Sequence, residues 1–135
     1  MIGFVIDASV LATWFLEDEV DPRVEFIVES LARLGACAPS LFFFEIRNAL
    51  LVNERRRRVT AAQSAEFVRE LSRMRISLES PRQDVDLLAL ARERQLTVYD
   101  AAYLELAIRE GLPLATLDRA LDKAAIAEGV TLFGT

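Results

Sequence analysis

The sequence predicts an α/β protein built on a mainly parallel sheet that is covered by helices on both faces. Short apolar runs of strand length alternate along the chain with segments of helical periodicity, which is the element order of parallel strands joined by crossover helices. Most of the strand-like runs are apolar, as expected for strands buried on both faces, and the weakest is 76–79, which contains Ser77 and Glu79. The chain has 135 residues and no evident linker. We therefore expect one domain over residues 1–135.

The N-terminal half is predicted to begin with a buried strand and to alternate from there. Its first apolar run is short, continuous and partly β-branched, as in such strands. Pro22 suits the first turn of the second helix and Gly35 suits its end, while Ser40 and Thr60 are expected to N-cap the third and fourth helices. The predicted elements are, in order, strand 2–6, helices 10–16 and 23–34, strand 36–38, helices 41–57 and 61–74, and strand 76–79.

The C-terminal half is predicted to continue this alternation. Gly111 and Gly129 each follow a helical pattern, in the position that ends a helix. The predicted elements are, in order, helices 81–94 and 99–110, strand 114–117, helix 119–128 and strand 130–133.

The composition narrows the chemistry and the compartment. There is no histidine, and Cys37 is the single cysteine, so a usual zinc site lacks ligands. A bound metal must then be held by oxygen, which selects Mg²⁺, Mn²⁺ or Ca²⁺. The longest run without a charged residue, 34–44, has 11 residues and is too short to span a bilayer. With no secretory pattern and no possible disulfide, we expect a cytoplasmic protein without membrane contact.

Two predicted strands end on an aspartate, Asp7 and Asp118. If these strands are parallel, both carboxylates lie at the edge where open α/β sheets bind ligands. Asp100 stands at the capping-box position of a predicted helix. Each aspartate could equally serve as a helix cap or a turn residue, with Ser9 and Thr116 as polar neighbours.

Glu45 is harder to explain as a surface residue, because it lies in the most apolar helical segment of the chain. An unpaired buried carboxylate costs several kcal/mol, so it must pair, take up a proton or bind a cation. Arg47, at i+2, lies on the wrong side of the helix to pair with it. Asn48, at i+3, shares its face and is expected to brace it.

These four acids change what the net charge of −5 implies. Taken alone, a negative charge argues against a nucleic-acid binder. Four carboxylates at one sheet edge would repel one another unless cations join them, and without them the chain is nearly neutral. The bulk charge therefore does not exclude a nucleic-acid substrate.

Two further features have both a structural and a functional interpretation. A basic run can either stabilise a helix C-terminus or bind RNA phosphates; it comprises Arg55, Arg56, Arg57 and Arg58. Three consecutive phenylalanines, at residues 42–44, are about 100° apart on a helix and cannot all face one core. Deep burial between sheet and helices is the expected explanation, and a partner surface is the alternative.

At these residues the sequence resembles the PIN-domain family, and within it the VapC toxins of type II toxin–antitoxin systems. The resemblance rests on the stretches "VIDASVL", "PSLFFFEIRNAL", "LTVYDAAYLELA" and "LATLDRAL", which follow the family's order and cover the chain almost end to end. It implies a three-layer α/β/α sandwich. It also implies a Mg²⁺- or Mn²⁺-dependent endoribonuclease whose catalytic, metal-binding acids are Asp7, Glu45, Asp100 and Asp118.

The same resemblance implies that Ser9, Asn48 and Thr116 support these acids. It further implies an RNA substrate such as tRNA or rRNA, a cognate antitoxin and a homodimer. Asp122, one helical turn after Asp118, is either a fifth member of the site or ordinary helix surface. Two other functions stay open: a catalytically inactive PIN-like RNA-binding module, and a phosphatase similar to the haloacid dehalogenases. The latter place a second Asp where this chain has Ser9.

Overall fold

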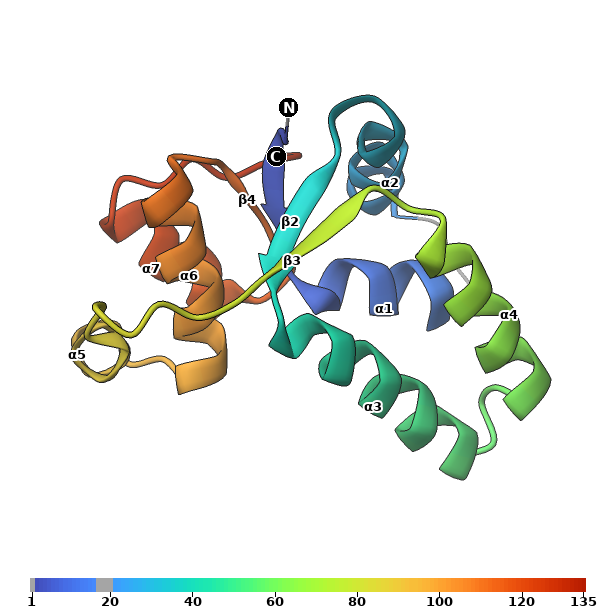
Figure 1. The fold of residues 1–135 in the computed structure, drawn as a ribbon. Coiled ribbons are helices and arrows are strands. Elements are labelled where there is room, and N and C mark those ends of the chain that lie inside the picture. The colour runs from blue at the N-terminus through green and yellow to red at the C-terminus, as the bar shows by residue number, and fades with distance from the viewer. Residues whose placement is uncertain (1, 17–20) are drawn as a thin grey trace.

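The computed structural model describes residues 2–16 and 21–135, and in this part of the chain four strands form one sheet. All neighbouring strands pair in parallel, in the order β3-β2-β1-β4 (Figure 1). The predicted parallel sheet is thereby confirmed. The strands are β1 (Phe4–Ile6), β2 (Ala36–Pro39), β3 (Ile76–Glu79) and β4 (Leu114–Ala115).

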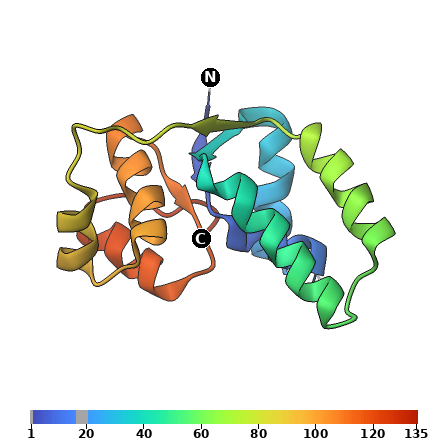
Figure 2. The same cartoon turned by 60° about the horizontal axis from the view of Figure 1, so that its bottom comes forward.

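Helices cover both faces of this sheet and complete a three-layer α/β/α sandwich (Figures 1 and 2). The N-terminal helices gather on one face: α1 (Ala8–Leu16), α2 (Pro22–Leu34), α3 (Leu41–Arg55) and α4 (Ala61–Ser72). The C-terminal helices gather on the other: α5 (Leu87–Arg94), α6 (Val98–Glu110) and α7 (Arg119–Ala127). The predicted fold class is confirmed.

The strand order places a topological switch point between β1 and β4. From β1 the chain adds β2 and then β3 on one side, and β4 is added later on the opposite side of β1. Adjacent crossovers therefore diverge at β1 and β4, and the carboxyl ends of these strands are where an open α/β sheet binds ligands. Asp7 directly follows β1, so it lies at this point.

Local signals explain several helix boundaries. The Asp21 side chain accepts a hydrogen bond from the Arg23 N–H and caps α2, whose first residue is Pro22. Thr60 and Gln63 form a reciprocal capping box at the start of α4. Ser40, in contrast, has helical backbone angles and makes no side-chain cap, so the prediction that it caps α3 is wrong.

Several predicted boundaries are also wrong. The helix predicted at 81–94 begins only at Leu87, because the Asp86 side chain accepts a hydrogen bond from the Ala89 N–H and caps the helix there. The helix predicted at 41–57 ends at Arg55, since Arg57 adopts a positive φ of 59°. The strand predicted at 130–133 is reduced to one bridge between Leu114 and Leu132.

The two strands at the switch point, β1 and β4, are shorter than predicted. The strand predicted at 2–6 begins at Phe4, and the strand predicted at 114–117 ends at Ala115. Beyond Ala115 the backbone donors turn to side chains: the Leu117 N–H donates to Ser9 Oγ and the Asp118 N–H donates to Thr116 Oγ1. Thr116 and Leu117, the residues lost from the end of the predicted strand 114–117, thus belong to a polar network.

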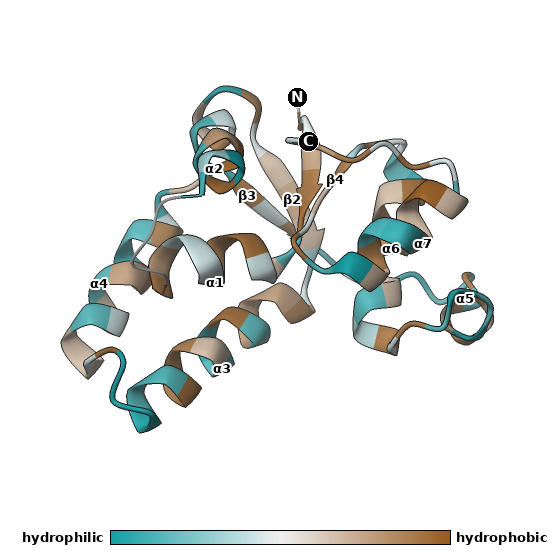
Figure 3. Cartoon of the chain, turned by 180° about the vertical axis from the view of Figure 1, so that it is seen from behind, coloured by the Kyte–Doolittle hydropathy of each residue, from teal (hydrophilic) through white to brown (hydrophobic). Residues whose placement is uncertain are grey.

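The core lies between the sheet and the helices, with the residues of β1 fully buried. The strands carry the hydrophobic colours of Figure 3, and α4 carries many hydrophilic ones. Of the three phenylalanines of α3, Phe42 is buried, but Phe43 and Phe44 are 41% and 70% exposed, so their predicted deep burial is wrong. None of the helices described is long and apolar enough to cross a membrane.

Candidate active site

Asp7 is the most buried of the predicted acids, at 6% exposure. Its backbone N–H donates to the Ala115 carbonyl at 2.9 Å, which fixes it between the ends of β1 and β4. Its Oδ2 atom accepts hydrogen bonds from Ser9 Oγ at 2.8 Å and from Thr116 Oγ1 at 2.6 Å. Both hydroxyls therefore hold one carboxylate oxygen and set the orientation of the side chain.

The two hydroxyls also order the chain that leads from β4 to α7. Ser9 Oγ accepts the Leu117 N–H at 3.1 Å, and Thr116 Oγ1 accepts the Asp118 N–H at 3.1 Å. Each hydroxyl thus donates to Asp7 and accepts from the backbone of the 116–118 segment. This network joins two of the predicted acids, Asp7 and Asp118, through residues at opposite ends of the chain.

Glu45 projects from the second turn of α3 and is half-buried. Its Oε1 atom accepts a 2.5 Å hydrogen bond from the Tyr103 hydroxyl of α6, a helix on the opposite face of the sheet. Tyr103 is fully buried and was not predicted. One sequence signal existed: a tyrosine one helical turn after Asp100, whose buried hydroxyl needs a partner.

Asp100 and Asp118 both lie at helix starts, as their interpretation as helix-capping residues also predicted. Asp100 is in the first turn of α6, where its backbone N–H donates to the capping hydroxyl of Thr97 at 3.1 Å. Asp118 is the N-cap of α7, and its Oδ1 accepts the Leu121 N–H at 3.1 Å. Capping uses the backbone of Asp100 and one oxygen of Asp118, so carboxylate oxygens of both remain for another role.

The acids act on one another electrostatically. Burial raises the pKa of Asp7, and the nearby Asp118 charge raises it further, against the hydrogen bonds from Thr116 and Ser9. Burial also raises the pKa of Glu45, with added repulsion from Asp7 and Asp100. Burial and the charges of Asp118 and Asp7 raise the pKa of Asp100. The four acids of the sequence prediction therefore form one group of mutually repelling carboxylates.

This group suits a hard divalent cation by its chemistry. Its donors are all oxygen, and a cation between them would relieve the repulsion that raises the pKa values. As the side chains stand, no three Asp, Glu or Cys residues within 2–16 and 21–135 are arranged to hold an ion directly. A bound ion would therefore require side-chain adjustment or water ligands, which Mg²⁺ commonly retains.

The remaining predicted residues lie outside this group. Asn48 is exposed and makes no side-chain hydrogen bond to Glu45 in the part of the chain described. Asp122 lies 4.0 Å from Arg23, with which it forms an ion pair at the edge of the site. Arg55 is ten residues beyond Glu45, roughly 15 Å along the same helix. The basic run is thus displaced from the acids by most of α3.

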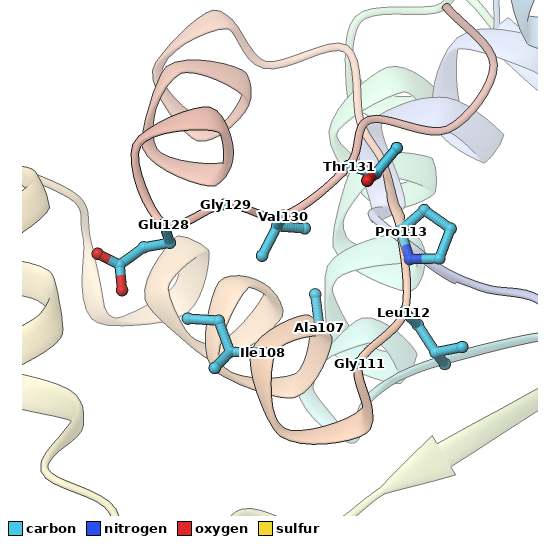
Figure 4. A pocket seen from close by; sticks show the side chains of 9 residues that line it. All are labelled: Ala107, Ile108, Gly111, Leu112, Pro113, Glu128, Gly129, Val130 and Thr131. Atoms are coloured by element: carbon cyan, nitrogen blue, oxygen red, sulfur yellow. The ribbon is translucent and has the colours of Figure 1, made fainter.

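Two cavities of about 250 Å³ are each lined in part by α6. One is lined by Ile108, Gly111 and Val130, near the C-terminus of α6 and far along that helix from Asp100 (Figure 4). The other is lined by Tyr99 and by Leu41, the first residue of α3. Neither cavity is lined by one of the four acids, but Tyr99 of the second cavity directly precedes Asp100 in the chain.

The site contains a buried aspartate at a strand end, held by two hydroxyls within a group of four carboxylates at a switch point. These features define the class of the protein as an α/β protein with an acidic site suited to hard cations. The chain matches the family of the PIN domain over residues 4–127, and it belongs to that family. The prediction made from the four sequence stretches is thereby confirmed.

Individual relatives support the same assignment. The chain is 32% identical to ribonuclease VapC3 of Pyrobaculum aerophilum over 87% of its own length and 90% of the relative's. It is 43% identical to exonuclease VapC9 of the same organism, over 89% and 84% of the two lengths. The crystal structure of PAE2754 from Pyrobaculum aerophilum is similar to this fold with a TM-score of 0.71 and 28% identity, over 91% of this chain and 84% of that one.

Proposed function

We propose that this protein is a Mg²⁺- or Mn²⁺-dependent endoribonuclease and the toxin of a type II toxin–antitoxin pair, acting in the cytoplasm. The observation that carries the proposal is Asp7, a buried carboxylate held by Ser9 and Thr116 and coupled to other acids. The names of the two relatives, a ribonuclease and an exonuclease, support nuclease chemistry. The PIN-domain match supports the same class.

Asp7, Glu45, Asp100 and Asp118 would hold the metal. Such an ion would lower the pKa of a bound water molecule and would neutralise charge on a phosphodiester. The chain's own contribution is orientation: Ser9 and Thr116 fix Asp7, and Tyr103 fixes Glu45. None of these roles needs an imidazole base, which fits a chain that has no histidine.

The central test is the substitution Asp7→Asn, assayed with RNA and Mg²⁺ or Mn²⁺. We expect cleavage to fall by at least a hundredfold, because Asn keeps the shape of the side chain and loses the charge. The matched control is Asp84→Asn, whose side chain is 64% exposed. Full cleavage by Asp7→Asn would exclude Asp7 as a ligand, and no cleavage by the unmodified protein with either metal would favour an inactive RNA-binding module.

The mode of cutting needs its own experiment, because one relative is named an exonuclease. A circular RNA has no ends, so only an endonuclease linearises it. We expect linear product with metal and none in EDTA. Cleavage of linear RNA with an intact circle would replace the endonuclease proposal by an exonuclease one, while hydrolysis of a generic phosphomonoester alone would revive a phosphatase.

The basic run supplies a candidate contact to RNA phosphates outside the acidic group. Arg58 donates to the Asn53 side chain, whereas Arg56 and Arg57 are exposed just past the end of α3. We expect the double change Arg56→Gln and Arg57→Gln to weaken RNA binding and to flatten its dependence on salt by up to about two counterions. An unchanged salt slope would eliminate Arg56 and Arg57 as phosphate contacts.

The antitoxin and the homodimer belong to the same proposal. The exposed Phe43 and Phe44 side chains supply apolar surface of the kind enriched in interface cores. A small neighbouring reading frame whose product suppresses the nuclease would support a toxin, and its absence would favour a housekeeping nuclease. A light-scattering mass equal to one chain would count against the homodimer.

A further inference from the structure

The cavity lined by Tyr99 and Leu41 contains a buried carboxylate that the proposed chemistry does not use. Glu105 of α6 is 8% exposed and lines this cavity. Its Oε2 atom accepts hydrogen bonds from Nε and an Nη of Arg109, at 3.3 and 3.1 Å. Its Oε1 atom is buried and has no hydrogen-bond partner in the described ranges. A buried acceptor without a donor is costly, so a ligand donor is its natural complement.

The walls of the cavity come from the carboxyl-end edge of the sheet and from helices α3 and α6. Its walls include Pro39 and Glu79 at the carboxyl ends of β2 and β3, and Leu41 at the start of α3. On α6 its walls are Tyr99, Ala102, Glu105 and Arg109, with spacings of three and four residues. Glu105 is five residues from Asp100 and two from Tyr103, so it points about 140–160° around the helix from them. The cavity and the acidic group therefore lie on different faces of α6 and come nearest in the chain at its N-terminal end, where Tyr99 lines the cavity and Asp100 belongs to the group.

The cavity suits a flat, uncharged ring system. Its volume of about 250 Å³ is just below that of pockets for drug-sized ligands, so it matches a single ring system. Tyr99 lines it and is 64% exposed, which leaves an aromatic face for stacking. Arg109 is paired with Glu105, and Arg82 with Asp84, so neither guanidinium offers an unpaired charge to a phosphate.

We propose that this cavity binds one unpaired nucleobase of the RNA substrate, next to the cleavage site, with Glu105 Oε1 accepting an N–H of the pairing edge and Tyr99 stacking on the ring. The proposal rests on the proposed nuclease function and assigns it a specificity pocket. Unpaired bases in RNA are recognised in this way, by stacking and by hydrogen bonds to their pairing edges. Single-stranded or looped RNA would then be the preferred substrate.

The direct test is binding of nucleoside 5′-monophosphates to metal-free protein, followed by amide chemical shifts in NMR. We expect GMP, AMP, CMP or UMP to shift the amides of Tyr99, Ala102 and Glu105, with one nucleotide preferred. Ribose 5-phosphate, which has no base, should leave them in place. Methylation of the pairing-edge N–H of the preferred nucleotide should weaken binding at least tenfold, as expected for a bond to a charged acceptor. Equal shifts with ribose 5-phosphate, or none with any nucleotide, would overturn the proposal.

Variants separate the pocket from the acidic group. Glu105→Gln should weaken binding of the preferred nucleotide at least tenfold, because Arg109 would retain the amide oxygen and leave an N–H donor facing the cavity. Glu110→Gln, an exposed change on the same helix, is the matched control. If Glu105→Gln fails to fold, Ala102→Leu fills the cavity without changing a charge and should abolish binding. Unchanged affinity in the folded variants would overturn the pocket.

Cleavage assays keep this proposal distinct from the proposed function. We expect the unmodified protein to prefer one base at a fixed position beside the cut, and Glu105→Gln to reduce that preference at least tenfold. Cleavage with no base preference at any position would sink the pocket and leave the nuclease. Nucleotide binding without cleavage of any RNA would sink the nuclease and leave the pocket.

Discussion

Thr116 has the most constrained role of any single residue near the acids. It is fully buried, donates its hydroxyl to Asp7, and accepts the backbone N–H of Asp118 through the same oxygen. Its backbone carbonyl accepts a hydrogen bond from Arg23 at 2.9 Å. One side chain therefore orients one acid, fixes the backbone of a second, and lies beside the ion pair that involves Asp122.

Replacing Thr116 by Val should separate these roles from packing, because Val has nearly the same shape and no hydroxyl. We expect a loss of about 1–3 kcal/mol in the free energy of unfolding, since two buried polar groups lose a partner. Nuclease activity should fall further than stability at a temperature where the variant is folded. Urea unfolding and RNA cleavage measure the two effects, and Thr116→Ser should recover most of the activity.

Tyr103→Phe removes only the hydroxyl that donates to Glu45. The expected cost is about 1 kcal/mol in the free energy of unfolding, typical of one net hydrogen bond. The pKa of Glu45 should rise further, because the Tyr103 bond stabilises its charged form. The acid side of the pH profile of cleavage, where activity increases with pH, should shift to higher pH. Calorimetry should show weaker Mg²⁺ binding. An unchanged pH profile would show that this hydrogen bond does not tune Glu45.

At the scale of single elements, α3 does two jobs on different faces. Its inner face, with Phe42 and Ile46, packs into the core, and its outer face carries the exposed Phe43 and Phe44. The Phe43 ring contacts Phe44 at 5.2 Å between centroids and lies 3.5 Å below the Arg47 guanidinium. The outer pair is therefore a small surface cluster on the helix that also positions Glu45.

This arrangement predicts opposite outcomes for two neighbouring truncations. Phe42→Ala should cost about 3–5 kcal/mol in the free energy of unfolding, because it opens a cavity in the core. Phe44→Ala should change it by less than about 0.5 kcal/mol. Urea midpoints of the two variants measure this difference. A large loss in Phe44→Ala would indicate that its side chain is buried in solution, as it would be in a dimer.

Features that depend on neighbouring residues could be predicted from the sequence, whereas features that depend on residues far apart in the chain could not. The capping pair Thr60–Gln63 and the strand 76–79 were predictable because neighbouring residues determine them. The end of β4 was not, because its backbone donors turn to Ser9 and Thr116 rather than to a strand. Asp7 and Asp118 stood out as the ends of predicted strands and Glu45 as a carboxylate in an apolar helix, whereas Asp100 stood out only as a capping residue. Tyr103 escaped because its partner, Glu45, is 58 residues away.

At the scale of the whole molecule, burial of the acids and repulsion among them destabilise the metal-free fold. Burial and mutual repulsion raise the pKa of Asp7, Glu45 and Asp100. The folded protein therefore retains protons that the unfolded chain releases. Two exposed acids, Glu66 and Asp84, have lowered pKa values from neighbouring arginines, and solvent screens their opposing contribution.

The sign of the pH dependence follows. Groups with raised pKa values give their full contribution to stability below their ordinary pKa values of 3.8 and 4.5, and lose it as pH rises through the raised ones. In EDTA, we expect the melting temperature to fall as pH rises above these ordinary values. Mg²⁺ or Mn²⁺ should reverse this fall.

Asp7→Asn supplies the control for this pH dependence. It removes the most buried charge, so its melting temperature in EDTA should not be lower than that of the unmodified protein, and its pH dependence should be flatter. A large loss of stability in EDTA would instead identify Asp7 as mainly a structural residue. Stability that rises with pH in the unmodified protein would contradict the assignment of raised pKa values to this group.

The hydrogen bond between Thr116 and Asp7 joins residues 109 positions apart. During synthesis, a growing chain that has displayed Asp7 still lacks Thr116, Asp118 and the whole of β4. Its first acid then has neither its second hydroxyl nor the neighbouring strand β4, so the ordered group of carboxylates cannot form until residues 116–118 have emerged. A nuclease assembled in this order cannot cut the message or the ribosome that is making it until almost all of the domain has emerged.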